Sequence, residues 1–100
     1  MIPAAFKIFT AEQWAQFHAD RIFIGAPVDL ADGYIHLSTA TQLEETLSKH
    51  FAGQSGLVIA EIDLAGFGDR LKWEPSRGGA LFPHLYAPLP MEAVKGTVRR

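Results

Sequence analysis

The stretch Leu57–Ile62 (LVIAEI) carries the strongest strand signal in this chain of 100 residues. Its apolar run is nearly continuous, which is typical of a strand that is buried on both faces. We therefore predict that this stretch is a central strand of a sheet, and that the remaining elements are arranged around it.

Two helices are predicted before this strand. Thr10 and Gln13 form a capping box ahead of a helix at Ala11–Asp20, and Thr39 and Gln42 form a second one. The apolar residues behind each box have helical spacing: Trp14 and Phe17 in the first helix, and Leu43, Leu47 and Phe51 in the second. Gly53 is a natural stop for the second helix.

Shorter strand signals occur at residues 6–9, 34–37, 71–74, 84–86 and 94–98, and residues 90–93 fit one helical turn. The glycine- and proline-containing stretches Gly25–Gly33 and Ser76–Gly79 are predicted to be loops. Because the helices come early and most strands come late, we expect an α+β fold. The length fits a single domain over residues 1–100.

The composition restricts the class of function. Nine Lys and Arg residues stand against 11 Asp and Glu, giving a net charge of −2, so no basic stripe for sequence-independent nucleic-acid binding is expected. The chain contains no Cys, which excludes disulfides, thiolate catalysis and Cys-ligated zinc. No apolar run approaches a membrane span, and residues 1–10 do not resemble a signal peptide. A cytoplasmic location is the resulting expectation.

A first polar motif lies at residues 32–38 (DGYIHLS). In a strand, Tyr34, His36 and Ser38 would share one face, and Ile35 and Leu37 would share the other. Ser38 would also precede a helix, whose N-terminus favours anions. We predict that His36 is catalytic and that Ser38 binds ligand. The alternative is a hydrogen-bonded sheet histidine beside a serine that only caps a helix.

A second motif begins at residues 73–79 (WEPSRGG). Glycines allow close backbone approach to a ligand, and the Arg77 guanidinium matches carboxylate or phosphate oxygens. Trp73 offers a stacking face, and Glu74 and Ser76 flank the loop, so these four residues are predicted to bind ligand. The alternative is a plain surface turn in which Arg77 is paired with Glu74.

The motif continues through residues 81–86 (LFPHLY), where alternation puts His84 and Tyr86 on one face. We predict that His84 is a second catalytic residue and that Tyr86 binds ligand. His18 and His50 lie at helical positions beside apolar residues and are not assigned to a site. Together the two motifs are expected to form the walls of one ligand pocket.

The chain resembles the domain of unknown function 952 family from about Phe6 to Val98. The motifs that carry the resemblance are residues 33–38, 50–53, 73–79 and 81–86. That family is grouped with the ADP-ribosyltransferase superfamily, which includes diphtheria toxin, poly-ADP-ribose polymerases and RNA 2′-phosphotransferases. The resemblance therefore implies a split, strongly bent β-sheet with two main helices and a dinucleotide-type cleft.

The sequence departs from the toxin and polymerase pattern at two places. Pro83 and His84 stand where those enzymes carry a catalytic glutamate, and their first-strand histidine or arginine has no clear counterpart, with Lys7 as the only candidate. We expect a pocket for a small phosphorylated or anionic, nucleotide-type ligand, with NAD as a candidate substrate of a transferase or glycohydrolase.

Two other functions remain open at this point. One is a non-catalytic binding module for a small anionic metabolite or a protein partner. The other is a metal-dependent hydrolase that uses His36, His84, Asp29, Asp32 or Glu74 as ligands.

Overall fold

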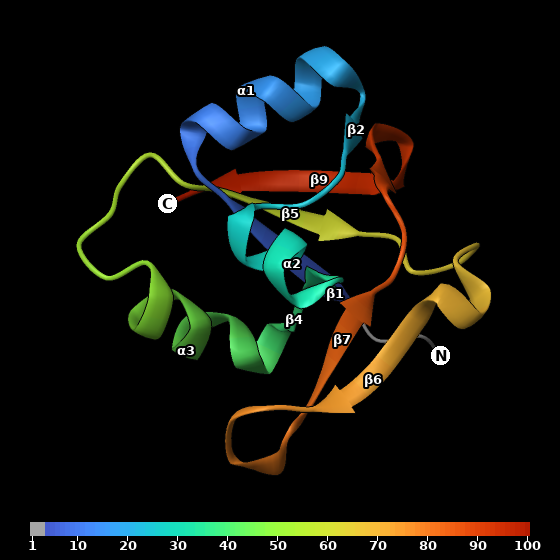
Figure 1. Ribbon diagram of the computed structural model, residues 1–100. Coiled ribbons are helices and arrows are strands. Elements are labelled where there is room, and N and C mark those ends of the chain that lie inside the picture. The colour runs from blue at the N-terminus through green and yellow to red at the C-terminus, as the bar shows by residue number, and fades with distance from the viewer. Residues whose placement is uncertain (1–3) are drawn as a thin grey trace.

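The predicted central strand is β5 (Val58–Ile62), which lies inside a four-stranded antiparallel sheet (Figure 1). The structure is a computed structural model that describes residues 4–100, apart from the side chain of Arg77. The strand order is β4-β1-β5-β9, and the other members are β1 (Ala5–Phe9), β4 (Ser38–Thr39) and β9 (Val94–Arg99). The predictions of strands at residues 6–9, 57–62 and 94–98 are confirmed.

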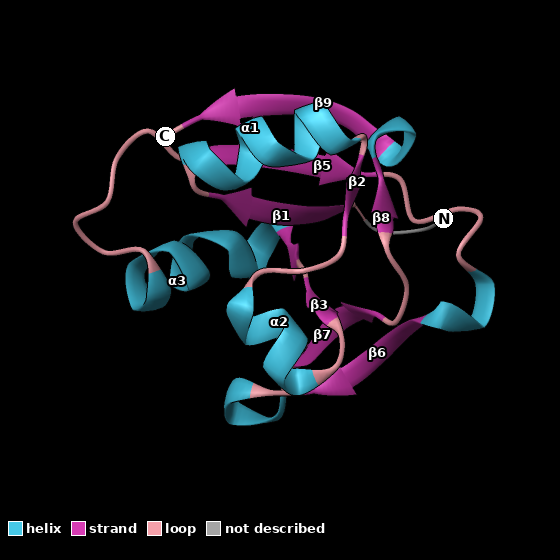
Figure 2. Ribbon diagram, turned by 45° about the horizontal axis from the view of Figure 1, so that its top comes forward, coloured by secondary structure: helices cyan, strands magenta, loops and turns pink. Residues whose placement is uncertain are grey.

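A second, three-stranded antiparallel sheet has the order β3-β7-β6 and lies beside the first (Figure 2). It consists of β3 (Ile35–His36), β7 (Leu81–Leu85) and β6 (Leu71–Pro75). The short strands β2 (Ile22–Phe23) and β8 (Leu89–Pro90) pair separately, and neither was predicted.

The two predicted helices are α1 (Ala11–Asp20) and α3 (Ala40–His50). At the start of α1, the hydroxyl of Thr10 accepts a hydrogen bond from the Gln13 amide at 3.1 Å, and the Gln13 side chain accepts one from the Thr10 amide at 3.0 Å. At the start of α3, the Thr39 amide donates to the side chain of Gln42 at 3.0 Å. The caps therefore begin both helices where the sequence predicted.

A third helix, α2 (Pro27–Asp32), corrects the prediction that Gly25–Gly33 is a loop. Pro27 stands at a favoured early position, and the Asp29 side chain accepts a hydrogen bond from the Ala26 amide at 2.8 Å. Gly33 ends the helix with φ 89°, a left-handed conformation that suits glycine. A six-residue helix is too short to show helical periodicity in the sequence. Pro27, Asp29 and Gly33, at its start and end, are therefore the residues from which it could have been predicted.

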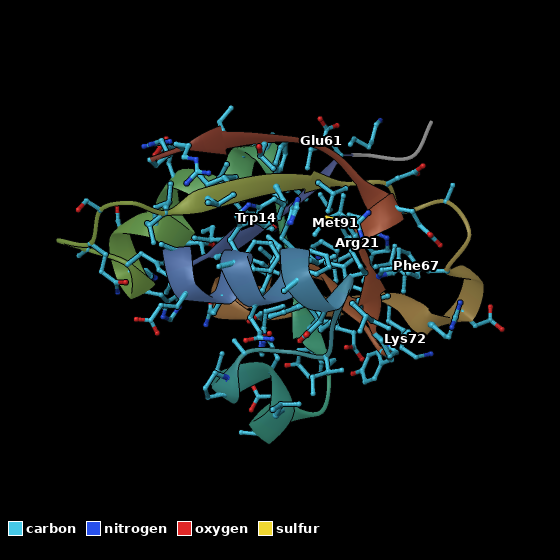
Figure 3. All side chains as sticks on the ribbon, turned by 90° about the horizontal axis from the view of Figure 1, so that it is seen from above. Trp14, Arg21, Glu61, Phe67, Lys72 and Met91 are labelled. Atoms are coloured by element: carbon cyan, nitrogen blue, oxygen red, sulfur yellow. The ribbon has the colours of Figure 1, made fainter. Side chains whose placement is uncertain are left out.

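The four-stranded sheet is covered on both faces, as predicted for a central strand. On one face, Phe9 packs against the rings of Trp14, Phe17 and Phe23, with centroid separations of 5.0–5.5 Å. Figure 3 shows Trp14 on the side of α1 that faces the sheet. On the other face, Ile8, Leu57 and Ile59 pack against apolar side chains of α3 and its C-terminal end.

Short 3-10 turns at Gly68–Arg70, Arg77–Gly79 and Met91–Ala93 complete the described chain, and the last confirms the helical turn predicted near residues 90–93. Within the described residues, no helix combines the length and the apolar character that crossing a bilayer requires. Over residues 4–100, the fold is thus a compact mixed α/β globule with three α-helices and antiparallel sheets.

Candidate functional site

Strands β3 and β7 place two imidazole rings side by side. His36 lies directly opposite His84 in the antiparallel register, and their ring centroids are 5.7 Å apart. The ring of Tyr34 stacks on His84 at 4.0 Å and lies 4.6 Å from His36. The ring centroid of Tyr86 lies 5.2 Å from that of Tyr34. We call Tyr34, His36, His84 and Tyr86 the imidazole cluster; it contains both residues that the sequence predicted to be catalytic.

Glu74 of β6 holds the His84 side of the cluster. Its Oε1 atom lies 2.8 Å from His84 Nδ1 and accepts a hydrogen bond from the Tyr86 hydroxyl at 2.7 Å. The bond from Tyr86, and next that of His84, holds the pKa of the Glu74 carboxyl below its usual value. The same bond raises the pKa of Tyr86 to about 12. The contact with Glu74 at Nδ1 fixes the orientation of the His84 ring, whose side chain is only 5% exposed.

His36 lies between two carboxylates. Its Nδ1 is 2.6 Å from Asp29 Oδ1, and its Nε2 is 2.9 Å from Asp32 Oδ2. An ionised carboxylate only accepts hydrogen bonds, so the two contacts are both hydrogen bonds when each ring nitrogen carries a proton. The two carboxylates differ in environment, because the side chain of Asp29 is 1% exposed whereas that of Asp32 is 45% exposed.

Lys7 of β1 supports this arrangement from inside the protein. Its ammonium nitrogen lies 3.2 Å and 3.0 Å from the two oxygens of Asp29 and donates to the backbone carbonyl of His36 at 3.1 Å. Asp29 also accepts the backbone amide hydrogens of Ala26 and His36. Lys7 thereby links the central sheet to α2 and β3.

Burial opposes both charges of this ion pair. For Asp29, burial by itself would raise the pKa, but the hydrogen bond from His36, the charge of Lys7 and two backbone amides lower it to about 2. For Lys7, burial lowers the pKa of the ammonium group, and Asp29 works against that shift. The pair is therefore stable as an ion pair only because the hydrogen bonds satisfy both partners.

The depressed pKa of Asp29 predicts a pH dependence of stability. A carboxyl group whose folded pKa lies below the unfolded value of 3.8 contributes stability above that value and loses it as the pH falls through about 2. We expect the urea midpoint of the wild-type protein to fall steeply between about pH 4 and about pH 2. The variant Asp29→Asn should show a flatter profile over that interval. An equally steep profile in the variant would refute this origin of the acid sensitivity.

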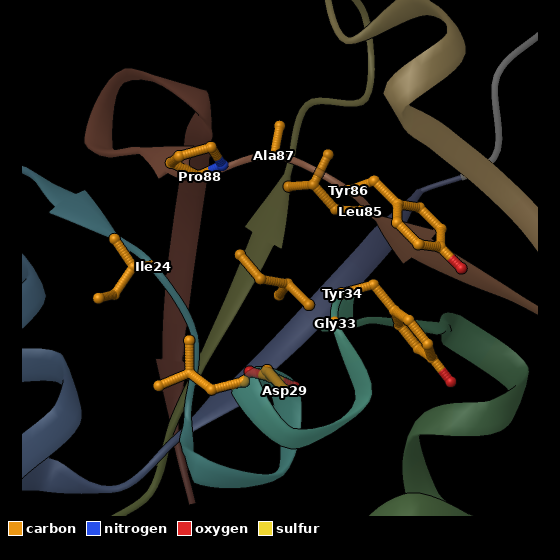
Figure 4. A pocket seen from close by; sticks show the side chains of 10 residues that line it. Ile24, Asp29, Gly33, Tyr34, Leu85, Tyr86, Ala87 and Pro88 are labelled. Carbon is orange, nitrogen blue, oxygen red and sulfur yellow. The ribbon is translucent and has the colours of Figure 1, made fainter.

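A small pocket adjoins the imidazole cluster (Figure 4). Its volume is about 230 Å³, and its walls are mostly apolar side chains of residues 24–35 and 85–88. Tyr34 and Tyr86 belong to both the pocket and the cluster. Ile24 and Leu30 line the pocket although they are 65% and 58% exposed. A ligand ring in this pocket would lie next to the two tyrosines, which separate it from the imidazoles of His36 and His84, since neither histidine lines the pocket.

Ser38 does not join the cluster, which corrects its predicted position on the His36 face. The strand is interrupted at Leu37, whose amide donates to the Pro83 carbonyl, and Ser38 pairs with Phe6 in the other sheet. Ser38 is buried, and its hydroxyl lies 3.0 Å from the hydroxyl of Thr46 in α3. Because the chain passes from the three-stranded to the four-stranded sheet at Leu37, the Ser38 side chain points into the interior and not toward the face that carries His36.

Trp73 also lies away from the cluster. It stands between Lys72 and Glu74 on β6, directly opposite Pro83, so strand alternation directs it to the other face of the small sheet. It is partly exposed there, at 37%. The predicted stacking role instead fits Tyr34, which the sequence analysis placed on the correct face without giving it a role.

The turn after β6 uses two of its backbone amides within the hairpin itself. The Ser76 amide donates to the Ala80 carbonyl, and the Gly79 amide donates to the Ser76 carbonyl. These two amides therefore close the hairpin and do not face a ligand. The side chain of Arg77 lies outside the described residues, so its predicted role stays a prediction.

The sequence analysis assigned Lys7 no partner and named Asp29 only as a candidate metal ligand. One signal was available for each of them. Lys7 is a charged residue between Phe6 and Ile8 in a strand that is otherwise apolar, and a buried charge needs a partner. Asp29 and Asp32 are three residues apart, which places them on one side of a helix once α2 is recognised. Among the described residues, no group of three or more His, Asp or Glu side chains is arranged to hold a metal ion.

The fold and the cluster define a small mixed α/β protein with paired imidazoles on a sheet. The chain belongs to the family described as "Protein of unknown function (DUF952)", which matches residues 8–97. It is similar to protein CC0527 from Caulobacter crescentus, whose crystal structure shares 45% identity and a TM-score of 0.92, covering 96% of this chain and 84% of that one.

The solution NMR structure of the same Caulobacter crescentus protein is similar as well. It shares 44% identity and a TM-score of 0.87, and the match covers 98% of this chain and 84% of that one. No functionally curated protein matches the chain.

Proposed function

We propose that the imidazole cluster and the adjoining pocket bind a phosphorylated, nucleotide-type ligand such as NAD or ADP-ribose, and transfer or hydrolyse its ribosyl group. One observation carries this proposal. The ring centroids of His36 and His84 lie 5.7 Å apart against the ring of Tyr34, with Glu74 at Nδ1 of His84 and a carboxylate at each nitrogen of His36. Paired imidazoles of this kind are suited to donate and accept protons in one reaction.

The size of the pocket supports a ligand that inserts one ring. Pockets for drug-sized molecules usually measure about 300–1,000 Å³. The pocket here, at about 230 Å³, is smaller, so the remainder of a dinucleotide would lie across the open face of the cluster. Tyr34 and Tyr86 supply aromatic walls for stacking.

The charges of the site support chemistry at a ribose. Cleavage of a glycosidic bond passes through a transition state with positive charge on the sugar, which carboxylates stabilise. Glu74 provides such a carboxylate, and in this proposal Nε2 of His84 provides the acid–base group. The face of Tyr86 already binds a cation, since Lys72 Nζ lies 6.0 Å from the centre of its ring. The positively charged pyridinium ring of NAD would make the same cation–π interaction there.

The phosphates are assigned in this proposal to His36, to Lys72 and to Arg77 of the hairpin turn. Lys72 is exposed on the same strand face as Glu74. The proposal also includes an ADP-ribosyltransferase-like fold, which the separation of the sheets at Leu37 and the passage from β4 directly into α3 support.

Calorimetry with NAD, ADP-ribose and a 2′-phosphorylated oligonucleotide tests this function, followed by chromatography of the mixtures for released base or transferred phosphate. We expect at least one ligand to bind below the millimolar range and to yield product. If none of them binds in that range, the proposal is wrong.

Binding without product over hours would instead support a non-catalytic binding module for a small anionic metabolite. The engagement of both His36 nitrogens by carboxylates favours this second function.

A further inference from the structure

His36 is held firmly on one side only. On its Nδ1 side stands Asp29, which is buried and also bound by Lys7 and by the backbone amides of Ala26 and His36. The positive charge of Lys7 and the negative charge of Asp29 offset each other inside the protein. This side of the ring therefore has fixed geometry and little net charge.

The Nε2 side of His36 faces an exposed carboxylate. Asp32 Oδ2 lies 2.9 Å from Nε2, and the side chains of His36 and Asp32 are 33% and 45% exposed. Ion pairs between exposed groups are weak, because water screens them and the side chains lose freedom. Asp32 is moreover the last residue of α2 and is followed by Gly33, so its backbone is at the end of the helix. This contact is the one that a ligand can most easily replace.

We propose that Asp32 occupies the place of an anionic ligand oxygen on Nε2 of His36, and that binding displaces it. Carboxylate and phosphate oxygens accept the same hydrogen bond from an imidazolium. Once Asp32 has moved, Nδ1 of His36 keeps its contact with Asp29 at 2.6 Å, whereas Nε2 has lost its acceptor. An arriving anion therefore restores the charge balance that Asp32 provided.

This inference deepens the proposed function by naming the atom that receives the anionic group, and it rests on that function only for the nucleotide part of the ligand. It also explains how a site with several carboxylates can accept an anion. Asp32 neutralises the imidazolium in the free protein and leaves the position when a stronger acceptor arrives.

The variant Asp32→Ala tests the proposal by calorimetric titration with inorganic phosphate and, separately, with ADP-ribose. Removing the competing carboxylate should strengthen binding of both about tenfold, which corresponds to about 1.4 kcal/mol. Asp20→Ala is the matched control, because Asp20 is also an exposed residue at the end of a helix and its loss changes the net charge equally. The control should bind within about twofold of the wild-type protein.

The double variant Asp32→Ala/His36→Gln should lose the gain, since the donor is then missing. When phosphate is titrated into Asp32→Ala, the NMR signals of the His36 ring should shift more than those of the other histidine rings. This result would place the phosphate at His36 without relying on the double variant. A gain no larger than that of Asp20→Ala, or a gain that persists without His36, overturns the proposal. The absence of phosphate binding to Asp32→Ala overturns it as well.

The outcomes separate this inference from the proposed function. Tighter phosphate binding through His36, with no binding of any nucleotide, supports the displacement of Asp32 and refutes the nucleotide ligand. Nucleotide binding that is indifferent to Asp32 supports the function and refutes the displacement.

Discussion

Replacing Lys7 by methionine should lower the free energy of unfolding by about 3–5 kcal/mol, because it leaves the buried Asp29 charge without its ammonium partner. Methionine has a similar length and fills the space, so the loss reports mainly on the charge. Urea denaturation at neutral pH measures the effect. Few single substitutions in a protein of this size should cost more.

Lys95→Met is the matched control for this experiment. Lys95 forms an exposed ion pair with Glu61 at 3.8 Å, so the same substitution there should cost less than about 1 kcal/mol. The double variant Lys7→Met/Asp29→Asn should regain part of the lost stability, because no unpaired charge is then buried. Equal stability of Lys7→Met and Lys95→Met would show that the buried ion pair does not support the fold.

The second large effect is expected at His84. If this ring transfers the proton in the proposed reaction, His84→Asn should reduce turnover about 10²–10⁴-fold, the usual range for an acid–base group. Ligand affinity should change far less, because the tyrosine walls of the pocket remain. Initial rates with the substrate found in the calorimetric screen give the measurement.

His18→Asn serves as the control, since His18 is an exposed histidine on α1 whose ring lies 6.4 Å from Trp14. It should leave turnover unchanged. A rate of His84→Asn within about threefold of the wild-type rate would show that His84 is not the acid–base group of the reaction. Thermal melting of both variants ensures that a loss of rate is not a loss of fold.

Much of the fold follows from short-range patterns. The capping box at Thr10 and Gln13 places the start of α1, and the apolar run at Leu57–Ile62 places the central strand. The pairing of His36 with His84 was also within reach, because strand alternation put each of them on a polar face beside a tyrosine. These predictions depend on residues within a few positions of one another.

Other parts of the site depend on contacts that local patterns do not contain. Strand alternation predicted one face for His36 and Ser38, but the chain changes sheets at Leu37 and buries Ser38 against α3. The same alternation, applied once the β6–β7 register is known, moves Trp73 away from the cluster. No pattern in the sequence specified these registers.

The amino-acid sequence by itself determined the α+β class, the two long helices, the central strand and the residue types of the site. Those features arise from periodicity and from caps that act within one turn or one strand. The tertiary structure decided which charges meet, above all at Asp29, where Lys7 arrives from 22 positions away along the chain. Burial makes that meeting obligatory, because neither charge could remain in the interior without the other.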